Sequence, residues 1–217
     1  MWGLSREAFG QEISRVAPEE LPVAAVDAMY GHYLELGRWN ERLGLIGRGT
    51  VEELMVRHYG EALAALPMIS AAVEAAVDLG SGGGFPGLVI AAARPGLRMT
   101  LVEARERKWV YLASAVRKAA LPCKCLNARV ANPLPAGLPE TIDLVTVRAL
   151  KLGTEVLGAL ARRLAPNGEV LLWVGEQAPD LPRELAVTTS LRLAGGERRR
   201  IVRLRRADPA NREPEQP

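Results

Sequence analysis

An apolar run that leads directly into clustered glycines lies near the middle of the chain. Residues 75–79 read AAVDL, and the sequence GSGGGFPG follows at positions 80–87. Glycines after a buried strand let the backbone turn sharply and let a ligand approach it closely. The N–H groups at the start of a following helix favour a carboxylate or phosphate. The segment therefore predicts a strand–loop–helix unit with a ligand site at its loop.

Short apolar runs and helical patterns alternate after this unit. The patterns predict strands at 99–102, 123–126, 142–147 and 170–174, and helices at 88–93, 105–121 and 154–164. Such alternation is typical of an α/β fold, a parallel sheet with helices on both faces. Two last runs, at 186–194 and 198–206, flank Gly195-Gly196 and predict a β-hairpin.

The segment before the first predicted strand has a different spacing of apolar residues. Apolar residues recur at spacings of three and four through residues 4–66, which predicts helices. Thr50 and Glu53 have capping-box spacing at the start of a helix expected from Val51 to about Leu66. We therefore expect an N-terminal helical extension at 1–66, a cofactor-binding core at 67–206, and a disordered tail at 207–217.

Composition and cysteine usage exclude several classes of protein. Of 217 residues, 48% are hydrophobic and 24% charged, which is ordinary for a globular chain and argues against wholesale disorder. No apolar stretch is long enough to span a membrane, and the charged N-terminus does not resemble a signal peptide. Cys123 and Cys125 are expected to be reduced, and no metal-binding spacing is present. We therefore expect a cytoplasmic protein without metal.

An acid follows the glycine segment at an informative distance. Glu103 ends the second predicted strand, 23 residues after Gly80, where a carboxylate can accept both ribose hydroxyls of an adenosine cofactor. Residues 82–87 formally match the dinucleotide fingerprint, so a nicotinamide enzyme is one alternative. A glycine turn that binds nothing is another. Counted from the strand, however, the pattern is Asp-x-Gly-x-Gly-x-Gly, beginning at Asp78.

That pattern resembles motif I of class I, Rossmann-like, S-adenosylmethionine-dependent methyltransferases. The Phe-Pro-Gly after the glycines is similar to one family in particular, the bacterial guanine-7 methyltransferases of small-subunit ribosomal RNA, also called glucose-inhibited division protein B. Further matches to that family lie, in order, at Trp39-Asn40, Arg57-His58, Ala128-Arg129-Val130 and Arg148-Ala149. Together they extend the resemblance over about residues 30–206.

The resemblance implies a cofactor, a partner and a set of site residues. The cofactor is S-adenosylmethionine, and the partner is 16S ribosomal RNA or the small ribosomal subunit, bound by a monomer. The implied cofactor-binding residues are Asp78, Gly80, Gly82, Gly84, Phe85, Glu103, Arg129, Val130, Ala131 and Arg148. The implied substrate-binding residues are Trp39, Asn40, Arg57, His58 and Lys151.

Several of these residues also have a purely structural alternative. Arg148 either orients cofactor or RNA or forms a structural ion pair, and Trp39 either stacks on a base or packs between helices. Phe85 either borders the cofactor or fixes the loop. The chain also departs from the family pattern, because Ala131 stands where an acid is expected and Val174 where a lysine is expected.

The chemistry that the resemblance implies needs no general base. Nitrogen 7 of guanine carries a lone pair and no proton, so the enzyme must align nitrogen, methyl carbon and sulfur and exclude water. Methylation at carbon 5 of a pyrimidine would need a cysteine nucleophile after the fourth or fifth strand, and Cys123 and Cys125 come earlier. Two alternatives stay open: a methyltransferase of another RNA or a small molecule, and a non-catalytic RNA-binding module that binds the cofactor.

The charges are distributed unevenly along the chain. The net charge of +3 divides into −4 for residues 1–66, +4 for 67–150 and +3 for 151–217. We therefore expect RNA to bind the core rather than the helical extension. The six arginines between 198 and 206 suggest either an RNA contact or an edge strand protected from aggregation.

Overall fold

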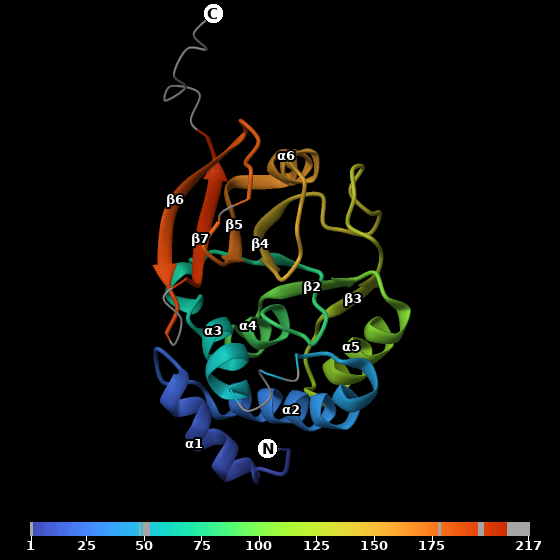
Figure 1. Cartoon of the computed structure of the whole chain (residues 1–217), viewed down its shortest axis with the longest axis vertical. Coiled ribbons are helices and arrows are strands. Elements are labelled where there is room, and N and C mark those ends of the chain that lie inside the picture. Colours follow the sequence, from blue (N-terminus) through green and yellow to red (C-terminus); the bar gives the residue numbers. More distant parts are fainter. Residues whose placement is uncertain (1, 48, 50–52, 178, 195–197, 208–217) are drawn as a thin grey trace, which may run out of the picture.

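The computed structural model describes residues 2–47, 49, 53–177, 179–194 and 198–207. Within these residues, seven strands form one sheet in the order β3-β2-β1-β4-β5-β7-β6 (Figure 1). The strands are β1 Ala75–Leu79, β2 Arg98–Glu103, β3 Lys124–Asn127, β4 Ile142–Arg148, β5 Leu164–Val174, β6 Leu185–Arg192 and β7 Arg200–Arg206. Strands β1 to β5 run parallel, and β7 pairs antiparallel with both β5 and β6.

Helices cover both faces of the sheet, as the alternating pattern predicts. Helices α4 (Gly87–Ala93) and α5 (Glu106–Lys118) pack on one face, and α6 (Thr154–Arg163) packs on the other. The strand order reverses between β1 and β4, so the loops that follow these two strands diverge to opposite faces. This reversal leaves a crevice at the carboxyl ends of the strands, the usual ligand position in such sheets.

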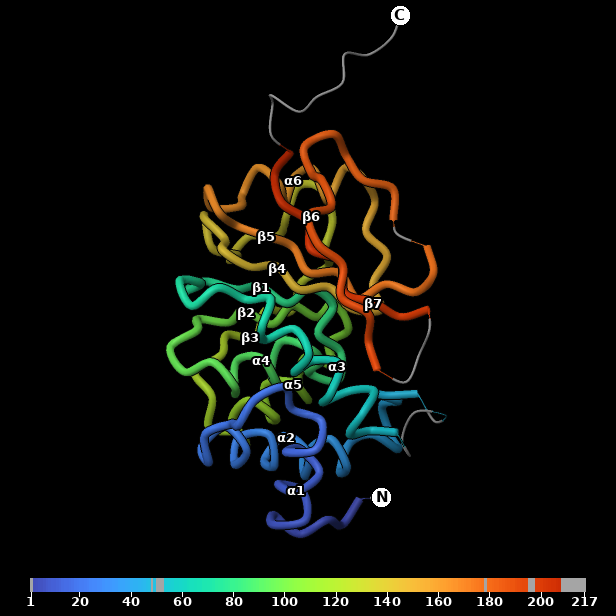
Figure 2. Tube along the Cα trace, turned by 90° about the vertical axis from the view of Figure 1, so that its left-hand side faces the viewer, coloured from blue at the N-terminus to red at the C-terminus, as the bar shows by residue number. Residues whose placement is uncertain are grey.

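The N-terminal helices lie on the same side of the sheet as α4 and α5 (Figure 2). They are α1 Arg6–Val16, α2 Val23–Leu43, the π-helical turn η2 Met55–Gly60, α3 Glu61–Leu63 and the 3-10 turn η3 Leu66–Met68. The predicted helix from Val51 to Leu66 is thus three short pieces, and its cap at Thr50 lies outside the described residues. Buried residues of these helices join those of α4 and α5 in one hydrophobic cluster. The division of the chain at residue 66 stays a prediction.

The predicted C-terminal hairpin is confirmed, but its second strand is not an edge. Strand β7 lies between β5 and β6, so the expectation of a protected arginine-bearing edge strand is wrong. Arg203 and Arg205 instead pair with the buried carboxylate of Glu169 at 3.2 and 3.0 Å. These arginines neutralise an acid on the neighbouring strand. Gly195-Gly196 and residues 208–217, including nearly all of the expected tail, lie outside the described residues.

Other differences from prediction are small. Strand β5 begins at Leu164, directly after α6, because Leu164 pairs with Ile142 before the register shifts. Cys123 and Cys125 carry free thiols, and only Cys125 lies within β3. No helix of the described residues is long and apolar enough to cross a bilayer.

Candidate functional site

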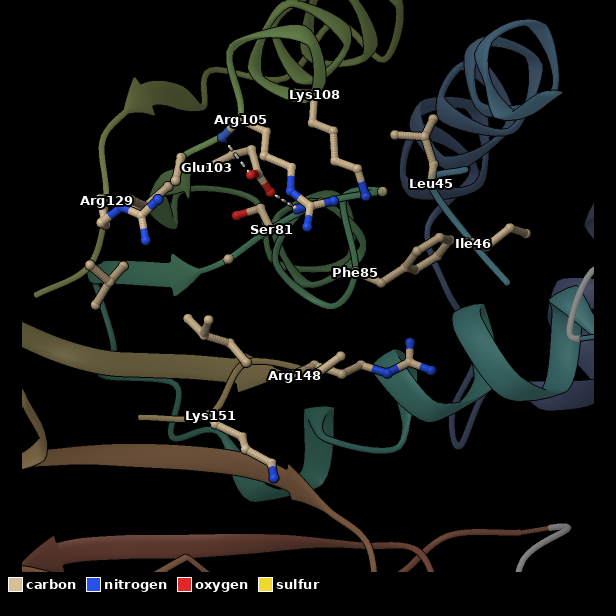
Figure 3. Close-up of a pocket in the computed structure, with 18 of the residues that line it drawn as sticks. Leu45, Ile46, Ser81, Phe85, Glu103, Arg105, Lys108, Arg129, Arg148 and Lys151 are labelled. Carbon is tan, nitrogen blue, oxygen red and sulfur yellow. Dashed lines mark hydrogen bonds between the residues drawn. The ribbon is translucent and has the colours of Figure 1, made fainter. Parts of the chain in front are cut away.

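An open cavity of about 650 Å³ lies at the carboxyl ends of β1, β2 and β4 (Figure 3). A cavity of this size accommodates a cofactor-sized molecule. Its walls come from six segments of the chain: residues 45–47 after α2, His58, residues 80–83 with Phe85, residues 102–105 with Lys108, and two loops at 128–130 and 148–151. The predicted glycine loop and the predicted acid therefore meet in one cavity.

The glycine loop runs along this cavity in a conformation that favours glycine. Gly80, Gly82 and Gly84 have φ values of 73°, 50° and 92°, in the left-handed region that L side chains rarely adopt. The backbone N–H groups of Gly80 and Ser81 both donate to the carbonyl of Val102 at 2.9 Å. These two bonds fasten the beginning of the loop to the end of β2.

Glu103 lies against this loop, at the end of β2. One carboxylate oxygen accepts the N–H of Gly82 at 3.1 Å, and the other accepts the N–H of Arg105 at 2.8 Å. The side chain lines the cavity, where an acid could accept ribose hydroxyls. Two backbone donors therefore fix the carboxylate that the sequence singles out.

Asp78 supports the loop from behind and does not line the cavity. The residue is buried, and one carboxylate oxygen accepts the hydroxyl of Thr146 at 2.6 Å. A Cβ atom at Gly87 would lie 2.5 Å from the Cβ of Asp78, so only glycine lets α4 begin this close to β1. Burial raises the pKa of Asp78 to about 6, and the hydrogen bond from Thr146 partly offsets it.

The buried carboxyl predicts a pH-dependent gain in stability for Asp78→Asn. The folded pKa of about 6 exceeds the ordinary value of 3.8, so the folded protein binds this proton more tightly than the unfolded chain does. The stability that the bound proton contributes is therefore lost as pH rises through 6. The free energy of unfolding of the variant, relative to that of the wild type, should rise by about 2–3 kcal/mol from pH 4 to pH 7.5. Urea unfolding of both proteins at the two pH values checks this. A stability difference that is the same at both pH values would contradict a raised pKa.

Most of the other predicted cofactor residues line the cavity. Those that do are Gly80, Gly82, Phe85, Glu103, Arg129, Val130 and Arg148. Gly84 and Ala131 are not among the lining residues, and neither is Asp78. The predicted site did not include Arg105 and Lys108, although both follow Glu103 at the end of a strand that points to the cavity. It also missed the wall formed by Leu45 and Ile46.

The predicted substrate residues divide into two groups. His58 and Lys151 line the cavity, whereas Trp39, Asn40 and Arg57 do not. The indole of Trp39 donates to Glu35 at 2.7 Å and packs edge-on against a tyrosine of α5, which is the structural alternative. The amide oxygen of Asn40 accepts the N–H of Ile46 at 3.0 Å. Asn40 therefore shapes one cavity wall without lining it.

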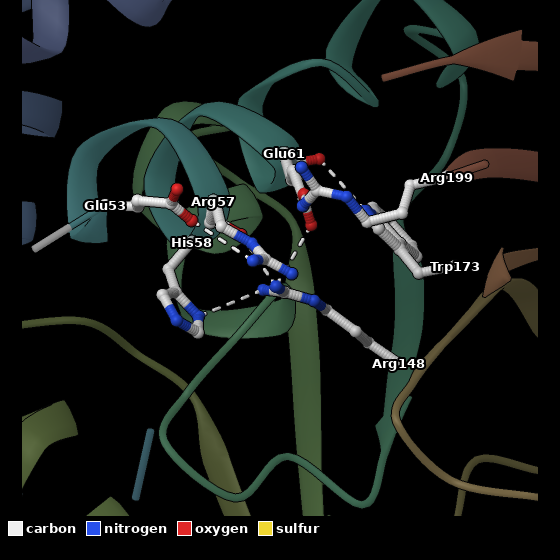
Figure 4. A network of polar contacts seen from close by, with 7 residues as sticks. All are labelled: Glu53, Arg57, His58, Glu61, Arg148, Trp173 and Arg199. Carbon is white, nitrogen blue, oxygen red and sulfur yellow. Dashed lines mark hydrogen bonds and ion pairs between the residues drawn. The ribbon is translucent and has the colours of Figure 1, made fainter. Parts of the chain in front are cut away.

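Arg148 belongs to a buried network of charged groups beside the cavity (Figure 4). Its guanidinium lies 3.0 Å from the carboxylate of Glu61 and donates to the carbonyl of Arg57 at 2.6 Å. Arg199 of the C-terminal region pairs with the same carboxylate of Glu61. Glu61 is 4% exposed, so two arginines compensate one buried acid. Arg148 thus has the predicted structural ion pair and also lines the cavity.

His58 contacts Arg148 from the side of η2. The Nδ1 atom of His58 lies 3.3 Å from the guanidinium of Arg148, and an arginine can only donate. Burial, together with the charges of Arg148 and Arg57, lowers the pKa of His58 to about 3. The ring is therefore neutral at pH 7 and accepts through Nδ1.

The cavity has a strongly basic lining. Five cationic side chains line it: Arg105, Lys108, Arg129, Arg148 and Lys151 (Figure 3). Glu103 is the one carboxylate among the described lining residues. A second cavity of about 800 Å³ shares the wall at residues 149–151 and extends to Val174. The carboxylate of Glu103 can hold a ligand, and the surrounding cations can bind a polyanion beside it.

Comparisons with known proteins found similar sequences. A family model described as rRNA small subunit methyltransferase G matches residues 26–204. The chain is 34% identical over 146 residues to the protein named Ribosomal RNA small subunit methyltransferase G from Paracoccus denitrificans, covering 64% of this chain and 71% of that protein. It is 30% identical over 198 residues to the protein of that name from Desulfotalea psychrophila, covering 90% and 86%.

Solved structures agree with the fold at low sequence identity. The crystal structure of TrmN from Thermus thermophilus matches with a TM-score of 0.57 and 19% identity, over 77% of this chain and 53% of that chain. A mutant of MtNAS in complex with S-adenosylmethionine matches with a TM-score of 0.56 and 12% identity, over 91% and 89%. These likenesses concern the arrangement of the strands and helices.

Proposed function

Since the chain belongs to the rRNA small subunit methyltransferase G family, we propose that it methylates nitrogen 7 of a guanine in 16S ribosomal RNA, using S-adenosylmethionine. The observation that carries this proposal is the meeting of the glycine loop and Glu103 in one basic cavity. We propose that the chain acts in the cytoplasm, where ribosomal RNA is found, and as a monomer.

The residues of the cavity fit the cofactor. Glu103 offers a carboxylate to the ribose hydroxyls, and at Gly82, where an added Cβ would meet no atom closer than 3.6 Å, the loop face is open to close approach. Arg129 and Val130 lie beside these residues and would border the adenine. When bound, S-adenosylmethionine supplies a methyl group activated by the positive sulfonium. Ala131 offers no acid for the adenine, so its binding would depend on backbone and apolar contacts.

The chain's own role in the reaction is to position the base and exclude water. Nitrogen 7 needs no deprotonation, and none of the lining groups has to act as a base. Arg148 is held by Glu61 and a backbone carbonyl, so it keeps a fixed position in the cavity wall that the base would meet. Nitrogen 7 is hidden in the deep groove of an A-form helix, so the guanine must be splayed out.

The RNA backbone would follow the basic rim of the cavity. Arg105, Arg129 and Lys151 are exposed there, and each can contact phosphate without reading sequence. The shared wall at residues 149–151 leads to the second cavity, which gives a base a route toward the cofactor. Val174 lines that second cavity and contributes no charge, and among the described lining residues Lys151 is the one cation common to both cavities.

The proposal is tested by methylation of small ribosomal subunits. Subunits from a strain that lacks this protein are incubated with the protein and labelled S-adenosylmethionine, and the RNA is digested and analysed by mass spectrometry. We expect one new 7-methylguanosine per 16S ribosomal RNA. Label on another nucleotide or on another RNA would overturn the assignment. Cofactor binding without turnover would favour a non-catalytic binding module, and a thermal shift with NAD alone would favour a nicotinamide enzyme.

A further inference from the structure

A buried histidine that the proposed mechanism does not use contacts the glycine loop from beneath. His32 lies on α2 and is fully buried. Its Nε2 atom lies 2.8 Å from the carbonyl oxygen of Gly83. The residue is far from the loop in sequence, and no predicted site includes it. Gly83 itself lines the cofactor cavity, so its carbonyl group joins the cavity wall to α2.

The hydrogen-bond pattern fixes the proton on this ring. Burial lowers the pKa of His32 to about 4, so the imidazole is neutral at physiological pH and carries one proton. A carbonyl oxygen only accepts, so Nε2 must donate to Gly83. The Nδ1 atom then accepts, and the hydroxyl of Tyr59 lies 3.0 Å from it, in position to donate. The tautomer with the proton on Nε2 is the one that can hold the loop.

Two other elements act on the same part of the loop. The hydroxyl of Tyr111, on α5, donates to the carbonyl of Gly83 at 3.1 Å. The ring of Phe85, which lines the cavity, packs edge-on against His32 and Tyr59 with centroids 5.0 and 5.1 Å apart. Because the carbonyl of Gly83 is held inward by two donors, the loop cannot rotate this peptide toward the cavity without breaking both hydrogen bonds.

We infer that His32 is a positioning residue for the cofactor, holding the Gly83 carbonyl away from the cavity so that the loop presents a preformed binding face. The inference rests on the proposed function, because it assigns the cofactor to this cavity. Its physical basis is the cost of leaving a buried carbonyl with one donor fewer. A Cβ atom at Gly84 would lie 2.9 Å from Nε2 of His32, so the ring and the loop are in direct contact.

The test is the variant His32→Phe, which keeps an aromatic ring and removes the donor. We expect the KM for S-adenosylmethionine, and its Kd by titration calorimetry, to rise about tenfold, as expected for one lost hydrogen bond to a buried group. The kcat with saturating cofactor should stay within about threefold. His32→Gln restores an N–H at a similar position and should recover most of the affinity. Tyr111→Phe, which removes the second donor, should weaken binding less.

The matched control is Trp109→Phe on α5. Its indole donates to the carbonyl of Cys125 at 3.2 Å, away from the loop, so this variant loses a hydrogen bond without touching the cavity. It should lower the melting temperature and leave the KM unchanged. The inference fails if His32→Phe behaves like Trp109→Phe, with a lower melting temperature and an unchanged KM. Failure of the wild-type protein to bind S-adenosylmethionine would instead overturn the proposed function, so the two failures are distinguishable.

Discussion

Gly82→Asp is expected to abolish binding of S-adenosylmethionine while leaving the fold intact. The N–H of Gly82 donates to Glu103, and a Cβ atom added at Gly82 would lie 4.0 Å from a carboxylate oxygen of Glu103. Aspartate would therefore put a second negative charge beside the one that should bind the ribose. It would also fill the face along which the ligand approaches the backbone. We expect affinity to fall at least about a hundredfold, roughly 3 kcal/mol, in titration calorimetry.

The control variant Gly82→Ala introduces the backbone strain of an L residue without the charge and most of the bulk of aspartate. The backbone at Gly82 has φ 50°, which costs an L residue about 1–2 kcal/mol, but no neighbouring heavy atom lies closer than 3.6 Å to the added Cβ. Gly82→Ala should therefore be less stable by this amount and should still bind S-adenosylmethionine measurably. Circular dichroism should report unchanged secondary structure for both variants. Wild-type affinity in Gly82→Asp would refute the assignment of the loop to the cofactor.

Glu61→Ala is expected to produce the largest loss of stability. Glu61 compensates Arg148 and Arg199, whose side chains are only 16% and 21% exposed. Removing it leaves two partly buried cations beside Arg57, whose charge already lowers the pKa of Arg148. Breaking a buried pair in this way costs about 3–5 kcal/mol. For a chain of this size the melting temperature should fall by about 10 °C.

The same network offers a control at its exposed end. Glu53 pairs with Arg57 at 3.1 Å, but its side chain is 55% exposed. Glu53→Ala should therefore change stability by less than about 0.5–1 kcal/mol. Glu61→Ala should also lower kcat, because Arg148 loses the partner that orients it at the cavity, whereas Glu53→Ala should not. Equal losses of stability in the two variants would show that burial does not set the strength of this network.

Local pattern predicted much of the fold because the relevant signals are short-range. The strand before the glycines, the acid at the end of β2 and the C-terminal hairpin each depend on spacing within a few residues. The edge position of the last strand could not be predicted in this way. Strand order depends on which strand pairs with the sheet edge, and here β7 rather than β6 pairs with β5.

The site was predicted in part for the same reason. Gly80, Gly82 and Glu103 follow directly after strands, so their place at the carboxyl edge follows from the parallel sheet. Arg57 and Asn40 were expected at the substrate and do not line the cavity, because a motif does not specify which side of a helix faces it. Arg105 and Lys108 were missed, since charged residues in the first turn of a helix are common and carry no distinctive spacing.

The sequence by itself determined the α/β alternation, the glycine loop and the acid that faces it, because these follow from local backbone chemistry and strand ends. Only the tertiary structure decided what holds them. It brought His32 of α2 under Gly83, and it brought Arg148 and Arg199 to one carboxylate at Glu61. Such contacts join residues tens of positions apart. They form only when packing buries polar groups and forces each to find a partner.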